Sequence, residues 1–154
     1  MVYIDWLTGI KNGGFELQFN YWVVSGSPSL VSTPVHKGSR ACLLHTGEYI
    51  EQTLVTPVAV NNMASCGIWL KNYGGSITVS IIATYSDAST TTITVSGNVP
   101  SYQFFNFINN FLGSQLTAGK IVTKFRISAS SNVYVDDFTL FYGSKQELTV
   151  LGFE

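Results

Sequence analysis

The sequence has few charged residues, and this scarcity limits both its surface and its partners. Asp, Glu, Lys and Arg make up 11% of the 154 residues, whereas a typical soluble domain has about 25%. The formal net charge is −1, and Lys and Arg form no cluster, so the electrostatic footprint of a nucleic-acid-binding protein is missing. Because 45% of the residues are apolar, Ser, Thr, Asn, Gln and Gly must supply most of the surface, as in extracellular or particle-bound β proteins.

Long hydrophobic runs are also missing. No apolar stretch approaches the roughly 20 residues that a membrane-spanning helix needs, so we expect no membrane insertion. The first residues, Met1–Trp6, lack the basic and apolar regions of a signal peptide. We therefore expect a virion or an extracellular surface as the location, reached by a route such as cell lysis.

Cysteine is scarce, with Cys42 and Cys66 as the two examples. Both lie in apolar, strand-like runs, which favours two buried free thiols. A disulfide is the alternative, since the sequence does not give the distance between them. Two cysteines and two histidines without close spacing form no zinc motif.

The dominant pattern is an alternation of apolar and polar residues with a period of two. It is clearest in residues 76–85, where Ile77, Val79 and Ile81 share one face, and it recurs at residues 90–95 and 121–127. Such alternation is typical of half-buried strands. Further candidate strands lie at residues 21–25, 41–45, 49–54, 63–71, 102–107 and 133–141. Short strands between turn signals, without a helical period, predict an all-β protein: one antiparallel two-sheet β-sandwich, or jelly roll, over residues 1–154.

The alternation breaks once in the last strand. Val133 and Val135 share a face, whereas the next apolar pair, Phe138 and Leu140, is shifted by one residue. A β-bulge at residues 136–137 would produce this shift and would turn Asp137 toward the end of the sandwich. The alternative is that the two apolar pairs serve different faces.

Several short motifs follow one another in an order that resembles the carbohydrate-binding modules with a galactose-binding-like jelly roll. The motifs are N-G-G-F-E at residues 12–16, Trp22, H-K-G-S-R-A at 36–41, G-E-Y-I-E-Q at 47–52, I-W-L-K at 68–71 and V-D-D-F-T-L at 135–140. The resemblance covers residues 12–142. Each motif alone is weak, but their shared order is moderately specific for the fold.

The resemblance implies a structural calcium site that joins the first strand to the last. Glu16 and Asp137 would supply carboxylates, and backbone carbonyls near Lys37 and Asp137 would supply further oxygens. Such a mixed oxygen set is what Ca²⁺ prefers. The alternative is that Glu16 caps turn amides and Asp137 pairs with a nearby base.

The resemblance also implies sugar recognition by exposed aromatic rings that stack on a pyranose, with polar side chains that bind its hydroxyl groups. The candidate residues are Trp22, Trp69, Tyr73, Tyr85 and Tyr102, with Gln103 and Arg126 as polar partners. Aromatic residues also form much of the core of any sandwich. The alternative for each of these rings is therefore that it packs in the core and does not bind a sugar.

Apolar residues continue beyond the resemblance, in arms at residues 1–11 and 143–154. They are Val2, Ile4, Trp6, Leu148, Val150 and Phe153. Apolar, strand-like ends favour docking on the same subunit or on a neighbour. The arms predict a homo-oligomer or attachment to capsid or fibre proteins.

The sequence offers no catalytic constellation. Asp136 and Asp137 are neighbours on a strand, so they point apart and cannot face one glycosidic bond. His36 and His45 have no nucleophile motif near them. We therefore predict a non-catalytic structural or assembly protein, such as a decoration, fibre or surface-attachment subunit of a virus or phage. The alternative is a free-standing carbohydrate-binding module with a poly- or oligosaccharide as partner.

Overall fold

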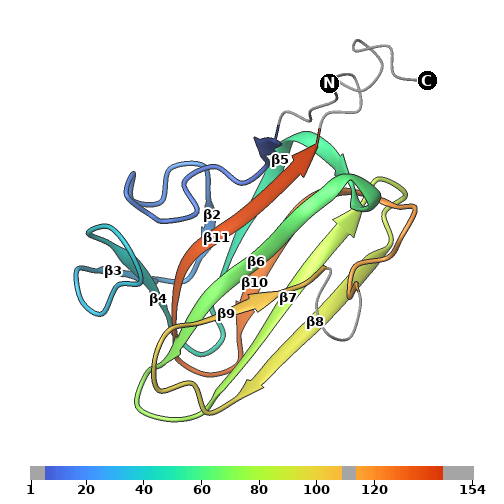
Figure 1. The fold of residues 1–154 in the computed structure, drawn as a ribbon. Coiled ribbons are helices and arrows are strands. Elements are labelled where there is room, and N and C mark those ends of the chain that lie inside the picture. Colours follow the sequence, from blue (N-terminus) through green and yellow to red (C-terminus); the bar gives the residue numbers. More distant parts are fainter. Residues whose placement is uncertain (1–5, 109–113, 144–154) are drawn as a thin grey trace.

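A computed structural model describes residues 6–108 and 114–143, which form two antiparallel β-sheets packed face to face (Figure 1). The six-stranded sheet contains β1 (Trp6–Thr8), β3 (Ser29–Val31), β4 (Ala41–Leu44), β6 (Met63–Asn72), β9 (Gln103–Asn106) and β11 (Val133–Gly143). The five-stranded sheet contains β2 (Val23–Ser25), β5 (Tyr49–Ala59), β7 (Ile77–Tyr85), β8 (Thr90–Gly97) and β10 (Ile121–Ala129). The predicted all-β sandwich is confirmed.

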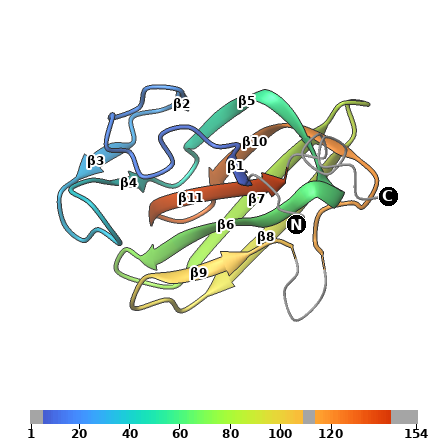
Figure 2. The ribbon, with the colours of Figure 1, turned by 45° about the horizontal axis from the view of Figure 1, so that its top comes forward.

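The strand order brings the two ends of the chain together. The six-stranded sheet runs β3-β4-β11-β6-β9, and β1 also pairs with β11. The five-stranded sheet runs β2-β5-β10-β7-β8 (Figure 2). The last strand therefore lies inside its sheet, with β4 beside its first three residues and β1 beside its last three. A 3-10 turn, η1 (Val60–Asn62), links β5 to β6, and no helix in the described part of the chain is long and apolar enough to cross a membrane.

The core lies between the two sheets and follows the alternation seen in the sequence. In β7 the residues at odd positions, from Ile77 to Tyr85, are buried, whereas those at even positions are half-exposed. Four phenylalanines are fully buried at the centre: Phe15, Phe107, Phe125 and Phe138. Burial of this apolar surface is the main force that holds the two layers together.

Two strands were not predicted, and both are three residues long. β1 pairs with residues 141–143 of β11, so part of the N-terminal arm belongs to the sandwich and extends the predicted core of residues 12–142. β3 pairs with β4. Three residues are too few for a period of two to stand out. Val2, Ile4, Leu148, Val150 and Phe153 lie outside the described residues, as does the side chain of Trp6.

The predicted bulge in the last strand is confirmed. Asp136 pairs with Trp69 of β6, and Thr139 pairs with Gly67, so two residues of β11 lie opposite one of β6. Asp137 has a left-handed φ of 46°. Phe138 is 1% exposed, so the bulge turns Asp137 outward and returns the apolar residues to the core.

The two cysteines are buried free thiols and form no disulfide. Burial raises the pKa values of the Cys42 and Cys66 thiols well above the usual range of a cysteine. Because the thiolate is the reactive form, both thiols are inert at neutral pH.

Candidate functional site

The N-G-G-F-E motif forms a loop that lies directly on the bulge of β11. The Phe138 N–H donates to the Gly13 carbonyl at 3.1 Å, and the indole Nε1 of Trp22 donates to the Asn12 carbonyl at 2.9 Å. The Asn12 side chain holds the loop from within, since its Nδ2 donates to the carbonyls of Gln18 and Asn20. The motif is thus a structural clasp between the first loop and the last strand.

Glu16 ties this loop to the H-K-G-S-R-A segment. Its carboxylate accepts hydrogen bonds from the Ser39 N–H at 3.0 Å, the Ser39 hydroxyl at 2.8 Å and the Arg40 N–H at 3.0 Å. The backbone N–H of Ser39 is the main cause that lowers the pKa of the Glu16 carboxyl. The charged carboxylate is therefore the form that this turn stabilises.

Asp136 and Asp137 bind the same segment from the other side. The Oδ2 atom of Asp136 accepts from the His36 N–H at 2.9 Å and from the Lys37 N–H at 3.4 Å, and its Oδ1 accepts from the Asp137 N–H at 2.9 Å. The Oδ2 atom of Asp137 lies 2.6 Å from His36 Nδ1. Burial is the main cause that raises the pKa of Asp136 to about 6.

The segment around His36 covers part of the outer face of the six-stranded sheet. The His36 ring stacks on Trp69, with 3.7 Å between centroids and 17° between planes. The Tyr102 hydroxyl donates to the Pro34 carbonyl at 2.9 Å. One face of Trp69 is therefore occupied by a protein ring.

The carboxylates expected to bind calcium have protein donors as partners. Glu16 accepts three hydrogen bonds, and Asp137 pairs with His36. Within residues 6–108 and 114–143, no group of three or more His, Cys, Asp or Glu residues is placed to hold a metal ion. These hydrogen bonds support the alternative that Glu16 caps turn amides and Asp137 pairs with a nearby base, and calcium stays a prediction.

A chelator experiment separates the two accounts of Glu16. A calcium site predicts that EDTA lowers the melting temperature of the native chain and leaves that of a Glu16→Gln variant unchanged. A hydrogen-bonded turn predicts that Glu16→Gln melts at a lower temperature than the native chain with or without EDTA, because an amide accepts fewer hydrogen bonds than a carboxylate. Thermal unfolding of both chains, with and without added Ca²⁺, gives the answer.

Two of the aromatic candidates for sugar binding are buried. Trp22 is 7% exposed and stacks on Phe15, with 5.7 Å between centroids. Tyr85 is 2% exposed, and its hydroxyl lies 2.7 Å from Thr91 Oγ1. These rings belong to the core and have no face to offer a sugar, because the sandwich needs large apolar side chains between its layers.

Of the remaining aromatic candidates, Trp69 lies in β6 of the six-stranded sheet, Tyr73 directly follows β6 and Tyr102 directly precedes β9. Trp69 and Tyr102 are half-buried beside His36, whereas Tyr73 is 46% exposed next to Tyr134, with 5.5 Å between centroids. Gln103 is exposed at the start of β9. Tyr73 is thus the one ring among the five candidates that is largely open to solvent.

Arg126 belongs to a polar cluster at the outer face of the five-stranded sheet, formed by Tyr49 and Glu51 of β5 with Lys124 and Arg126 of β10. The Arg126 guanidinium lies 3.9 Å from the centroid of Tyr49, and its Nε donates to Glu51 Oε1 at 2.7 Å. Lys124 Nζ lies 3.7 Å from the same oxygen. We call these four residues the β5–β10 cluster.

Hydroxyl groups surround the β5–β10 cluster on the same face of the sheet. They come from Thr78, Ser80 and Thr84 of β7, Thr90, Thr92, Thr94 and Ser96 of β8, and Ser128 of β10. Arg126 was predicted from the sequence, whereas Lys124, Tyr49 and Glu51 were missed. The alternation in residues 49–52 was the available signal for Tyr49 and Glu51, since it places both side chains opposite the buried Ile50 and Gln52.

Comparisons with known proteins place the fold. One similar structure is a family 61 carbohydrate-binding module in complex with β-1,4-galactotriose; it has a TM-score of 0.61 and 17% identity, and the alignment covers 88% of this chain and 99% of that one. The chain has the jelly-roll fold of carbohydrate-binding modules. A second is the CBM22-1 xylan-binding domain of Paenibacillus barcinonensis Xyn10C, with a TM-score of 0.60, 10% identity and coverage of 93% and 97%.

The same jelly roll occurs within larger proteins. The enzymatically active domain of tailspike protein 4 from bacteriophage CBA120 has a TM-score of 0.56 and 14% identity, and the alignment covers 89% of this chain and 21% of that one. Other matching modules are non-catalytic parts of enzymes. A scan against protein-family models finds no match, and neither does a search of curated proteins.

Proposed function

We infer that this chain is a non-catalytic carbohydrate-binding module that holds a glycan on the outer face of its five-stranded sheet. The observation that carries this proposal is the β5–β10 cluster, in which an aromatic ring, a guanidinium, a carboxylate and an ammonium group meet on a sheet face rich in hydroxyl groups.

The chemistry of the cluster suits sugar hydroxyl groups. Arg126 and Lys124 only donate hydrogen bonds, whereas the Glu51 carboxylate only accepts them. The side chains of Arg126 and Lys124 are 36% and 34% exposed, so both can reach a ligand. Contacts among the four residues hold them in place before a ligand arrives, which lowers the entropy cost of binding.

The similar structures support a glycan as the ligand and guide the choice of test sugars. One was solved with β-1,4-galactotriose, and another is a xylan-binding domain. Both align with most of this chain and with nearly all of their own length. Identity is too low for either ligand to be carried over, so galactan and xylan are starting points for a wider panel.

Affinity electrophoresis and calorimetry with galactan, xylan and a broad glycan panel test the proposal. We expect Arg126→Ala and Tyr49→Ala to weaken binding by about tenfold or more, which corresponds to about 1.4 kcal/mol. Tyr73→Ala is the matched control, since it removes an exposed tyrosine that lies in the turn after β6 and packs against Tyr134 of the opposite sheet. Loss of binding in the Tyr73 variant alone would move the site to the six-stranded sheet, and no binding to any glycan would refute the proposal.

A subunit of a virus or phage particle is the second candidate. The scarcity of charge and the apolar arms favour it, and a phage tailspike domain has the same fold. Decoration, fibre or attachment subunits would have capsid or fibre proteins as partners and a virion as their location. Glycan binding comes first, because the similar structures that align over nearly their whole length are carbohydrate-binding modules.

The structural contacts of Asp136 and Asp137 support a non-catalytic role. Asp136 accepts three backbone N–H groups, and Asp137 pairs with His36, so both carboxylates serve the loop. His45 pairs with Glu48 at 2.8 Å. Neither histidine is hydrogen-bonded to a serine, threonine or cysteine side chain in the described contacts, whereas a histidine that activates such a nucleophile lies within hydrogen-bond distance of it.

A further inference from the structure

The strand β8 is a long edge of the five-stranded sheet. It has eight residues, and all eight pair with β7 in one unbroken register. No strand in the described part of the chain pairs with its other side. The other strands at the ends of the two sheets are β2, β3 and β9, with three, three and four residues. Of the four strands that end the two sheets in the described part of the chain, β8 is the longest, and its length suits a template for another strand (Figure 1).

The edge at β8 lacks the features that keep sheet edges from pairing. Proteins protect exposed edges with charged side chains, proline, bulges or short strands. The β8 sequence, T-T-T-I-T-V-S-G, has no charge and no proline, and its pairing with β7 shows no bulge. No Asp, Glu, Lys, Arg or His occurs between residues 88 and 119. Threonine, valine and isoleucine also have high β propensity.

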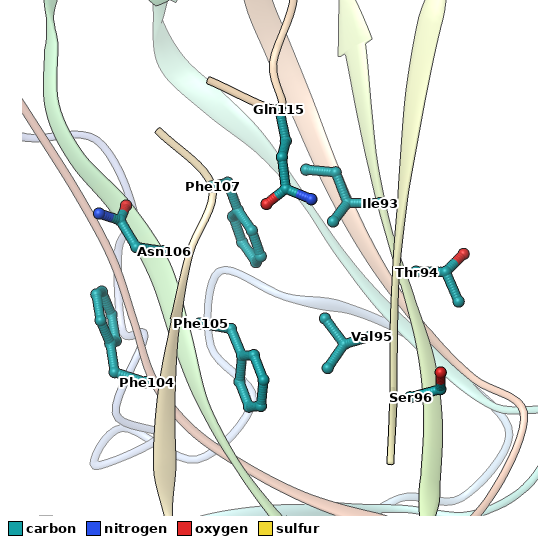
Figure 3. Close-up of a pocket in the computed structure, with 9 residues that line it drawn as sticks. All are labelled: Ile93, Thr94, Val95, Ser96, Phe104, Phe105, Asn106, Phe107 and Gln115. Atoms are coloured by element: carbon teal, nitrogen blue, oxygen red, sulfur yellow. The ribbon is translucent and has the colours of Figure 1, made fainter. Parts of the chain in front are cut away.

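A groove opens between β8 and β9, where the two sheets meet at this edge. It has a volume of about 380 Å³. Figure 3 shows Ile93 and Val95 of β8 facing Phe105 and Phe107 across the groove, whereas Thr94 points away from it. A strand added beside β8 would place its inward-facing side chains at the mouth of this groove, because neighbouring strands share the orientation of paired residues.

The groove and the edge together define the strand that fits them. Its inward face must be apolar to match Val95 and Phe105, and its outward face must be polar to continue the hydroxyl-bearing surface. The β8 strand has this pattern, with Ile93 and Val95 on one face and Thr92 and Thr94 on the other.

We propose that β8 pairs with the β8 strand of a second copy of this chain, in an antiparallel register about a twofold axis. The two five-stranded sheets then form one continuous sheet. Threonine lies opposite threonine on the outer face, a favourable cross-strand pair. An edge without charge does not repel its own copy, and it has nothing with which to select a charged peptide. A twofold interface is also the commonest form of homodimer.

Sedimentation velocity and light scattering of the full chain test this interface. We expect a concentration-dependent dimer for the native chain. The variant Thr94→Lys/Ser96→Lys places four positive charges at the junction and is expected to weaken the dimer by about a hundredfold or more. The matched control is Ser80→Lys/Thr78→Lys, since these residues are the β7 partners of Thr94 and Ser96 on the same face. The control is expected to remain a dimer.

Cross-linking identifies the occupant of the edge. In the double variant Thr92→Cys/Thr94→Cys, oxidation is expected to join two copies, since antiparallel pairing brings these positions within disulfide distance. The native cysteines are buried and do not interfere. The proposal is overturned if the chain stays monomeric up to about 1 mM. The free energy of dimerisation would then be weaker than about 4 kcal/mol. A dimer that survives the lysines in β8, or forms no cross-link, overturns it as well and points to the arms or another face.

Discussion

Replacing Gly13 with alanine is expected to lower the free energy of unfolding by about 4 kcal/mol or more, a large effect for one methyl group. A Cβ atom at this position would collide with the backbone carbonyl oxygen of Phe138. That contact involves backbone, which cannot rotate away as a side chain can. The same two residues are joined by the hydrogen bond from Phe138 N–H to the Gly13 carbonyl, so the loop must leave the bulge to make room.

Gly75→Ala is the control for this prediction. A Cβ atom at Gly75 would have no neighbour within 4 Å, and the residue is not among those with positive φ. Its substitution is expected to change stability by less than about 1 kcal/mol. Urea titration of both variants measures the difference, and equal stabilities would show that the clasp between the first loop and β11 is unimportant.

Replacing Asp136 with alanine is expected to lower the free energy of unfolding by about 3 kcal/mol, because the N–H groups of His36 and Asp137 lose their acceptor inside the protein. Asp136 is 0% exposed, so water does not take its place without opening the loop. The Asp136→Asn variant keeps one acceptor oxygen, so its free energy of unfolding is expected to fall by less than that of Asp136→Ala. Similar losses in the two variants would contradict the hydrogen-bond argument.

The same residue makes stability depend on pH. Its pKa is about 6 in the folded chain, above the ordinary value of 3.8, so the fold favours the protonated form. The part of the stability that comes from this raised pKa is thus fully present below pH 3.8 and is lost as pH rises through about 6, by about 3 kcal/mol at most. Measured relative to Asp136→Asn, the stability of the native chain should fall between pH 4 and pH 8; a rise would refute this assignment.

Strand positions could be predicted where alternation extends over many residues. The predicted strand at residues 76–85 corresponds closely to β7, and the prediction for residues 121–127 matches most of β10. The bulge was also predictable, because the shift between Val135 and Phe138 is visible in the sequence itself. β1 and β3 were missed, because three-residue strands exist only through their partners.

The candidate site could be predicted only in part, since burial and neighbours decide what each aromatic residue does. Trp22 and Tyr73 look alike as candidates, but one lies in the core and the other is exposed. Trp69 lies on the outer face, yet a histidine from a distant loop covers it. These outcomes depend on contacts between residues far apart in the sequence.

The sequence by itself determined the class of fold, the direction of each side chain along the long strands and the place of the bulge. These properties are local, because neighbouring side chains in a strand point to opposite faces. Only the tertiary structure decided that Arg126 meets Glu51 across 75 residues, that His36 covers Trp69, and that β8 lies at an edge. Strand order and register follow from the packing of the whole chain, which alternation within one strand does not specify.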